Sequence, residues 1–272
     1  MRQFKFNTIL LILFWVVLAV ILGMYDLEIS KQLVNENSGW AKFLENYGMI
    51  PGLLVILSGI YIYCSFIKIK SGVWSYVQRI VLFLVSSGLI FYLMEILLDK
   101  LILENFLTSL IIAFALNLII FIVLQIRTQV KSTIAIKYAK VVIGMAFFGY
   151  VICIQVVKYL WGRVRFRELD AAFSQFTPWY LPQGITGFDS FPSGHAATGF
   201  MLLSLLILLH NKKQWIKNSA LLLIILWGTV LSLSRVVIGA HYASDVLFGS
   251  FFIIFAFIIL QKNSKSQASI NK

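Results

Sequence analysis

The feature that most constrains this chain is a series of long apolar runs. A helix needs about 20 apolar residues to cross about 30 Å of hydrocarbon, whereas a soluble core is built from shorter amphipathic stripes. Backbone N–H and C=O groups find no water inside a bilayer, so such runs are predicted to be helical. The sequence therefore predicts an all-α, polytopic transmembrane helical bundle of about eight spans. The runs are Thr8–Met24, Ile50–Ile67, Ile80–Leu98, Phe106–Ile126, Val141–Val157, Ser193–His210, Ser219–Val237 and Ala243–Leu260.

Composition supports this class and excludes others. Hydrophobic residues make up 60% of the chain and charged residues 12%, whereas soluble proteins are about 25% charged. The net charge of +12 raises the question of nucleic acid, but no soluble basic domain is present to bind it. Basic residues that flank membrane spans and attract anionic lipid headgroups explain the charge better. We predict membrane lipids, and no nucleic acid, as partners. Cys64 and Cys153 lie within apolar runs and are interpreted as small hydrophobic residues rather than as a disulfide.

The chain divides into three predicted regions. Residues 1–137 hold the N-terminal spans and an outer loop, residues 138–262 a membrane core, and residues 263–272 a short, polar, frayed cytoplasmic tail. The first run follows Arg2 and Lys5 and so resembles a signal peptide, but no Ala-x-Ala-like cleavage site comes after it. We therefore predict a retained first span. The polar break between the third and fourth spans, Asp99–Asn105, is the least distinct boundary.

Charge on the connecting segments predicts the orientation. With both termini in the cytoplasm, most Lys and Arg residues lie on inner segments, and the acidic residues lie outside or at span ends that face outside. We predict a multi-pass cell-membrane protein whose Lys158–Pro192 loop is on the outer face. That loop is long for a connection within a bundle, which favours a function. Its aromatic residues are expected in the headgroup layer: Trp161, Phe173, Phe176, Trp179 and Tyr180.

Three polar clusters stand at span ends on this same face. The segment Lys158–Phe166 leaves the fifth span, Phe191–His195 enters the sixth, and Ser234–Asp245 links the seventh to the eighth. Because consecutive spans run in opposite directions, the topology alone brings the three clusters to one side. They are therefore expected to form one site.

The cations in these clusters indicate an anion site. A single basic residue at a span end is usually an anchor, but Lys158, Arg165 and Arg235 converge on a region with two histidines. A guanidinium group can donate two parallel hydrogen bonds to two oxygens of a phosphate, and a lysine adds a positive charge. Ser193 and Gly194 open a helix whose free N–H groups suit an anion. Plain capping of that helix by Ser193 is the alternative, and it is compatible with anion binding.

His241 and Asp245 have the spacing of a catalytic pair. Four residues apart on a helix, they share a face, so the carboxylate can hold one imidazole nitrogen and leave the other free to attack. The rival interpretation is a zinc site made by His195, His241 and Asp245. Three nearby cations would repel a divalent ion, so we predict no metal and no cofactor. His210, beside Lys212 at the opposite face, is interpreted as an interfacial residue.

The motifs resemble a known family. The patterns Lys158-x6-Arg165, Pro192-Ser193-Gly194-His195 and Ser234-Arg235-x5-His241-x3-Asp245 are similar to the three-part signature of the type 2 phosphatidic acid phosphatase (PAP2) superfamily, in the family order. They cover about a third of the chain. The string Trp161-Gly-Arg-x-Arg, with Phe176-Thr-Pro-Trp179 further on, also resembles a bacterial membrane lipid phosphatase branch.

The resemblance implies a mechanism without a metal. His241 would be the nucleophile that forms a phosphohistidine, Asp245 would orient it, and His195 would protonate the leaving oxygen. The residues that would hold the phosphoryl oxygens are Lys158, Arg165, Ser193, Gly194 and Arg235. Two features depart from the family: Phe166 stands where proline usually follows Arg165, and the family core has six membrane helices, fewer than the spans drawn here.

Other functions remain open at this stage. The enzyme hypothesis is hydrolysis of a lipid phosphomonoester or pyrophosphate, such as phosphatidic acid, phosphatidylglycerol phosphate, an isoprenyl pyrophosphate or a lipid A phosphate. A transporter or lipid-headgroup receptor would use the same basic pocket, but it has no need for His241 with Asp245 or for His195. A vanadate-dependent haloperoxidase shares this kind of pocket on a soluble helical protein. A sugar-phosphate phosphatase is a further alternative.

Overall fold

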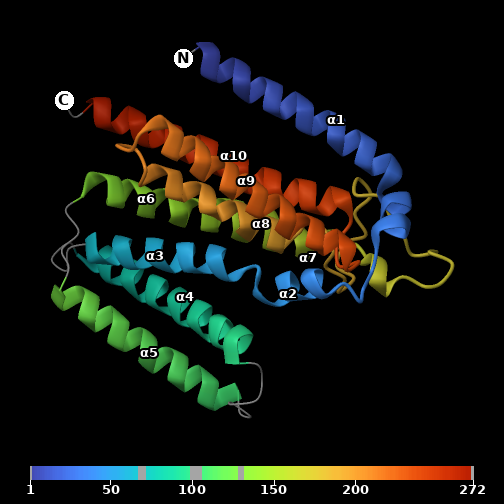
Figure 1. Ribbon diagram of the computed structural model, residues 1–272. Coiled ribbons are helices and arrows are strands. Elements are labelled where there is room, and N and C mark those ends of the chain that lie inside the picture. Colours follow the sequence, from blue (N-terminus) through green and yellow to red (C-terminus); the bar gives the residue numbers. More distant parts are fainter. Residues whose placement is uncertain (1, 67–71, 99–105, 128–131, 271–272) are drawn as a thin grey trace.

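The computed structural model describes residues 2–66, 72–98, 106–127 and 132–270 (Figure 1). Within these ranges all the regular secondary structure is helical. In chain order the helices are α1 (Arg2–Leu33), α2 (Gly39–Tyr47), α3 (Ile50–Phe66), α4 (Val73–Leu98), α5 (Phe106–Arg127), α6 (Thr133–Gly144), η1 (Met145–Val156), α7 (Val157–Trp161), η2 (Phe166–Glu168), α8 (Gly194–Phe200), η3 (Met201–Ile207), α9 (Gln214–Val237) and α10 (Ala243–Ile270).

Seven helical segments in the described residues are long and apolar enough to cross a membrane. The fold is thus the predicted polytopic helical bundle. The sixth predicted span is shorter than expected, because it consists only of α8 and η3, with 7 residues each. At 1.5 and 2.0 Å per residue these cover about 25 Å. The first turn of this short segment is buried among other helices. The segment therefore does not have to span the full length of the bundle.

Some boundaries differ from the sequence prediction. Helix α1 continues past Met24 to Leu33, so Asp26 lies within a helix rather than in an outer loop. No glycine or proline interrupts these last turns, which is why the helix extends until the polar segment after Leu33. Helix α10 continues to Ile270, so the tail predicted to be frayed is helical to that residue. The predicted break at 99–105 lies outside the described residues.

The helices are arranged around the short α8–η3 segment. Helix α8 packs against α9, α10 and η1, and α3 packs against α6 and η3. Helices α4 and α5 lie outside α3, and α1 lies on the other side of the bundle against α10 (Figure 1). The N-terminal helices therefore border the C-terminal half of the chain on two sides.

Two glycines allow backbones to approach closely at the centre. An added Cβ at Gly249 of α10 would meet the Ser193 carbonyl oxygen, and one at Gly52 of α3 would meet the Thr198 carbonyl oxygen. Lipid provides no hydrophobic force between helices, so close packing through small residues is how membrane helices associate. These contacts hold the start of α8 against α10 and α3. The chain termini lie toward one end of the bundle, and the start of α8 lies toward the other (Figure 1).

Candidate functional site

The three predicted clusters meet at one end of the bundle. Gly162, with φ of +64°, ends α7 in the left-handed conformation that glycine adopts readily. Beyond this turn, the Ser190 N–H donates to the Arg163 carbonyl at 2.9 Å, which joins the first cluster to the second. The Ser193 N–H donates to the Asp245 carbonyl at 2.9 Å, which joins the second to the third. The structure thus brings together the clusters that the topology predicted to be neighbours.

The loop between the clusters folds back onto the bundle. Trp161 Nε1 donates to the Trp179 carbonyl at 2.7 Å, and the Trp179 ring lies 4.5 Å from that of Phe248. Phe176 packs against Tyr242 at 5.4 Å. These contacts tie the loop to α10 and to the segment before it, and the position of its rings in the headgroup layer stays a prediction. Tyr180 remains 54% exposed.

His241 is held by a backbone carbonyl. Its Nδ1 donates to the Ser190 carbonyl at 2.6 Å, and Oδ2 of Asp245 lies 3.7 Å from the same nitrogen. The second distance is too long for a hydrogen bond. The sequence predicted that the carboxylate holds the ring, but the direct partner is Ser190. No described residue is hydrogen-bonded to Nε2, so this nitrogen is available to a ligand.

Burial keeps the His241 imidazole neutral. The side chain is 3% exposed and lies between α9 and α10. Burial is the largest cause that lowers the pKa of His241 to about 4; the charges of Lys158 and Arg235 add to it, and Asp245 opposes it. At neutral pH the ring is therefore unprotonated, which is the state a nucleophile requires.

Asp245 organises the residues around His241. Its Oδ2 accepts the Ser190 hydroxyl at 2.6 Å and the Tyr242 N–H at 2.9 Å. Its Oδ1 accepts Arg163 Nη1 at 2.6 Å. Ser190 thus links the two groups, because its hydroxyl binds Asp245 while its carbonyl binds His241. Asp245 is completely buried, as expected for a carboxylate with several donors.

Sequence reasoning did not assign Arg163, which is the most buried cation of the site at 1% exposure. Its guanidinium donates to the Ser244 hydroxyl, to both Asp245 and Asp26, and to the Thr177 carbonyl. It also lies 3.9 Å above the Tyr242 ring. The only signal in the sequence was a further arginine inside the first cluster.

The three cations predicted to hold phosphate each face a carboxylate. Lys158 Nζ donates to the backbone carbonyl of Asp189 at 2.5 Å and lies 3.4 Å from its Oδ2, and Arg165 Nη2 lies 2.6 Å from Asp189 Oδ1. Arg235 Nη2 donates to Glu45 Oε1 at 3.1 Å. Burial would raise the pKa of Asp189, but Lys158 and Arg165 lower it below its usual value. Sequence analysis assigned neither Asp189 nor Glu45 to the site.

Several guanidinium donors of the site remain open. Arg235 Nε and Nη1, and Arg165 Nε, are buried and have no acceptor among the described residues. A buried N–H without a partner costs about 1–3 kcal/mol, more when it is charged. Such donors are suited to the oxygens of an anion.

The start of α8 provides His195, Ser193 and Gly194. His195 Nε2 lies 3.0 Å from the Glu45 carbonyl. The Ser193 hydroxyl accepts the Ala196 N–H at 3.4 Å, which is the capping that sequence reasoning considered. Gly194 is buried, and a Cβ there would lie 3.3 Å from the Tyr150 hydroxyl. Phosphate binding by Ser193 and Gly194, and proton donation by His195, stay predictions.

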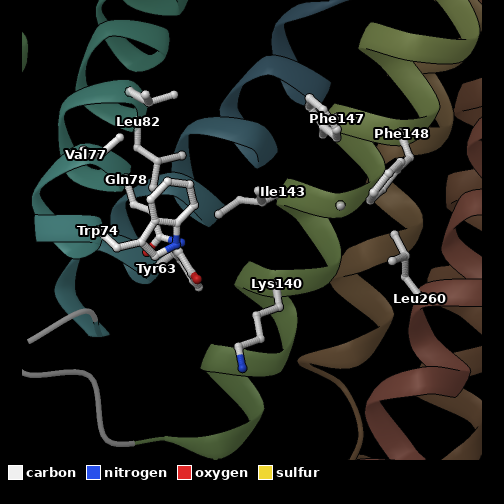
Figure 2. Close-up of a pocket in the computed structure, with 12 residues that line it drawn as sticks. Tyr63, Trp74, Val77, Gln78, Leu82, Lys140, Ile143, Phe147, Phe148 and Leu260 are labelled. Atoms are coloured by element: carbon white, nitrogen blue, oxygen red, sulfur yellow. The ribbon is translucent and has the colours of Figure 1, made fainter. Parts of the chain in front are cut away.

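An apolar cavity of about 480 Å³ lies elsewhere in the molecule. Figure 2 shows Tyr63 and Trp74 on one wall, and Ile143, Phe148 and Leu260 toward the other. Its residues on α3, α4 and α10 lie at the ends of these helices that are far from the polar clusters. Lys140 is the one charged residue among those that line it. It has none of the acid–base groups found around His241.

The comparisons with known proteins agree with the motif resemblance. The family model described as the PAP2 superfamily matches residues 137–266, which include every helix end that forms the polar clusters. Searches of curated proteins and of solved structures find no match. A match to this superfamily supports a phosphatase-type function in general. Residues 137–266 of this helical membrane protein are thus similar to the PAP2 superfamily.

Proposed function

We propose that the protein is an integral membrane phosphatase that hydrolyses a lipid-linked phosphomonoester or pyrophosphate without a metal ion. One observation carries the proposal: the neutral His241 has an available Nε2 in the same polar cluster as the open donors of Arg235. A pocket that only binds phosphate has no need for an oriented, unprotonated imidazole.

The proposed reaction has two steps. His241 Nε2 attacks phosphorus and forms a P–N bond, while the bond from phosphorus to the leaving oxygen breaks and His195, protonated before this step, gives that oxygen its proton. Water then attacks the phosphohistidine: a P–O bond forms, the P–N bond to His241 breaks, His195 takes the proton from the water, and phosphate is released. Lys158, Arg165 and Arg235 stabilise the charge on the phosphoryl oxygens. Asp245 balances the positive charge that develops on His241.

Substrate phosphate would replace carboxylates at the cations. Asp189 is 46% exposed and Glu45 is 27% exposed in their ion pairs, and partly exposed pairs contribute about 0–1 kcal/mol. A phosphate group offers more charge and more acceptor oxygens than either carboxylate. Replacement of these carboxylates by the substrate phosphate is therefore favourable. When no substrate is bound, Asp189 and Glu45 hold the cationic side chains in place.

Exposed apolar side chains near the site support a lipid substrate. Leu181, Ile185 and Phe188 of the loop before Asp189 are 51%, 65% and 38% exposed. A lipid whose phosphate reaches the site would bring acyl or prenyl chains to such a surface. A free sugar phosphate or a nucleotide would leave these side chains without a partner.

Phosphate release by the purified protein in detergent micelles tests this function. We expect phosphatidic acid, phosphatidylglycerol phosphate or an isoprenyl pyrophosphate to be cleaved much faster than glucose 6-phosphate, with activity retained in EDTA. Faster cleavage of the soluble ester would overturn the lipid proposal alone. Loss of activity in EDTA that zinc or magnesium restores would support the metal alternative.

We also propose that both termini are cytoplasmic and that the site is on the outer face of the cell membrane. The positive-inside bias of the connecting segments supports this orientation. A single cysteine at Gln183, in a variant without native thiols, should react with an impermeant reagent on intact cells. A cysteine at Gln214, at the other end of the bundle, should not. Labelling only at position 214 would reverse the proposed orientation.

A further inference from the structure

Helix α1 lies outside the region that matches the family model, yet it supplies a carboxylate to the site. Asp26 is completely buried, seven residues before the end of the helix at Leu33. Ionisable residues within membrane helices are costly, and they usually face a partner inside the bundle. Here the partner is Arg163, the guanidinium that also binds Asp245.

Asp26 uses both of its oxygens on residues beside His241. Oδ2 accepts Arg163 Nη2 at 2.9 Å, and Oδ1 accepts the Ser244 N–H at 2.9 Å. The Ser244 hydroxyl also donates to Oδ2 and accepts Arg163 Nη1 at 2.9 Å. Asp26 therefore holds the guanidinium and the first turn of α10 with the same carboxylate.

A chain of contacts connects Asp26 to the imidazole. Arg163 is planar, and it places Nη2 on Asp26 and Nη1 on Asp245. With Oδ1 bound to Arg163, the other oxygen of Asp245 faces Ser190 and His241. Ser190 in turn provides the carbonyl that holds His241 Nδ1. A change at Asp26 would reach His241 through these fixed partners.

Docking of α1 does not by itself require this ion pair. Trp15 of α1 stacks on Phe251 at 4.2 Å and meets Phe248 edge-on at 4.7 Å. The Ala19 carbonyl accepts Trp179 Nε1 at 2.9 Å. These neutral contacts fasten α1 to α10 and to the loop. A buried ion pair adds little free energy to the packing of α1, because the cost of removing both charges from water offsets much of their attraction.

We infer that Asp26 is a positioning residue of the active site, which acts through Arg163 and Asp245 on His241. The first membrane helix is then part of the working enzyme and more than an anchor. The inference rests on the proposed phosphatase function, because it concerns the rate of attack by His241. Asp26 touches no reacting atom itself.

The test compares Asp26→Asn with Glu28→Gln, an exposed residue two positions further along the same helix. An amide cannot accept at both positions, so either Arg163 Nη2 or the Ser244 N–H would face an NH₂ donor. We expect kcat to fall about 10- to 100-fold, as when a group that orients a functional ligand is lost. KM and inhibition by inorganic phosphate should stay within about twofold, and Glu28→Gln should match the wild type.

A double-mutant cycle separates positioning from docking. If Asp26 acts through Asp245, then adding Asp26→Asn to Asp245→Asn should reduce kcat much less than it does alone. An equal reduction in both backgrounds, or wild-type kcat in Asp26→Asn, would overturn the inference. If Asp26→Asn does not fold, Ser244→Ala tests the same chain of contacts and should show the same non-additivity. Absence of phosphatase activity in the wild type would instead refute the proposed function.

Discussion

Replacing His241 with alanine is expected to abolish hydrolysis of both a lipid phosphate and an activated aryl phosphate. The variant keeps the cations that bind phosphate but loses the nitrogen that attacks phosphorus. A better leaving group cannot replace a missing nucleophile, so both substrates should be affected alike. Steady-state phosphate release measures the loss of activity. Binding of inorganic phosphate to the variant shows that the pocket is intact.

His195→Ala is the control for this prediction. Loss of a general acid costs about 10²–10⁴-fold on a substrate whose leaving group needs a proton. The loss should shrink for the activated ester, which needs none, and Asp245→Asn should fall between the two histidine variants. Substantial hydrolysis of the activated ester by His241→Ala would show that covalent catalysis at His241 is wrong.

Arg163→Met is expected to reduce the stability of the folded protein by about 3–5 kcal/mol, because removal of one partner leaves buried charges unpaired. Asp26 and Asp245 are both completely buried, and they would then face each other without the cation between them. Methionine fills much of the volume but donates no hydrogen bond. Reversible unfolding in mixed micelles, followed by tryptophan fluorescence, measures the change.

Arg167→Met is the matched control for Arg163→Met. Arg167 pairs with Glu45 at 3.0 Å and is 28% exposed, so its loss should cost about 0–1 kcal/mol. The double variant Arg163→Met with Asp26→Asn should be more stable than Arg163→Met alone, since one unpaired carboxylate is removed. Equal stability of the Arg163 and Arg167 variants would contradict the buried cluster described here.

Much of the fold followed from hydropathy because membrane helices are local structures. Each span satisfies its own backbone hydrogen bonds, so an apolar run of sufficient length identifies it without knowledge of its neighbours. The ends were harder to place. Helix α1 continues past its apolar run to Leu33, and there Asp26 meets a buried partner, while α8 and η3 have only 7 residues each and begin among buried side chains. Both features depend on what surrounds the helix.

The candidate site divides in the same way. The sequence alone determined that Lys158, Arg165, His195, Arg235 and His241 stand at neighbouring span ends, since alternating topology puts those ends on one side. Only the tertiary structure decided that Glu45 and Asp189 pair with these cations, that Asp26 pairs with Arg163, and that Ser190 rather than Asp245 binds His241 directly. Hydrophobic runs and topology follow from the order of residues along the chain. The ion pair between Asp26 of α1 and Arg163, just after α7, depends instead on which side chains the packing brings within about 3 Å of each other.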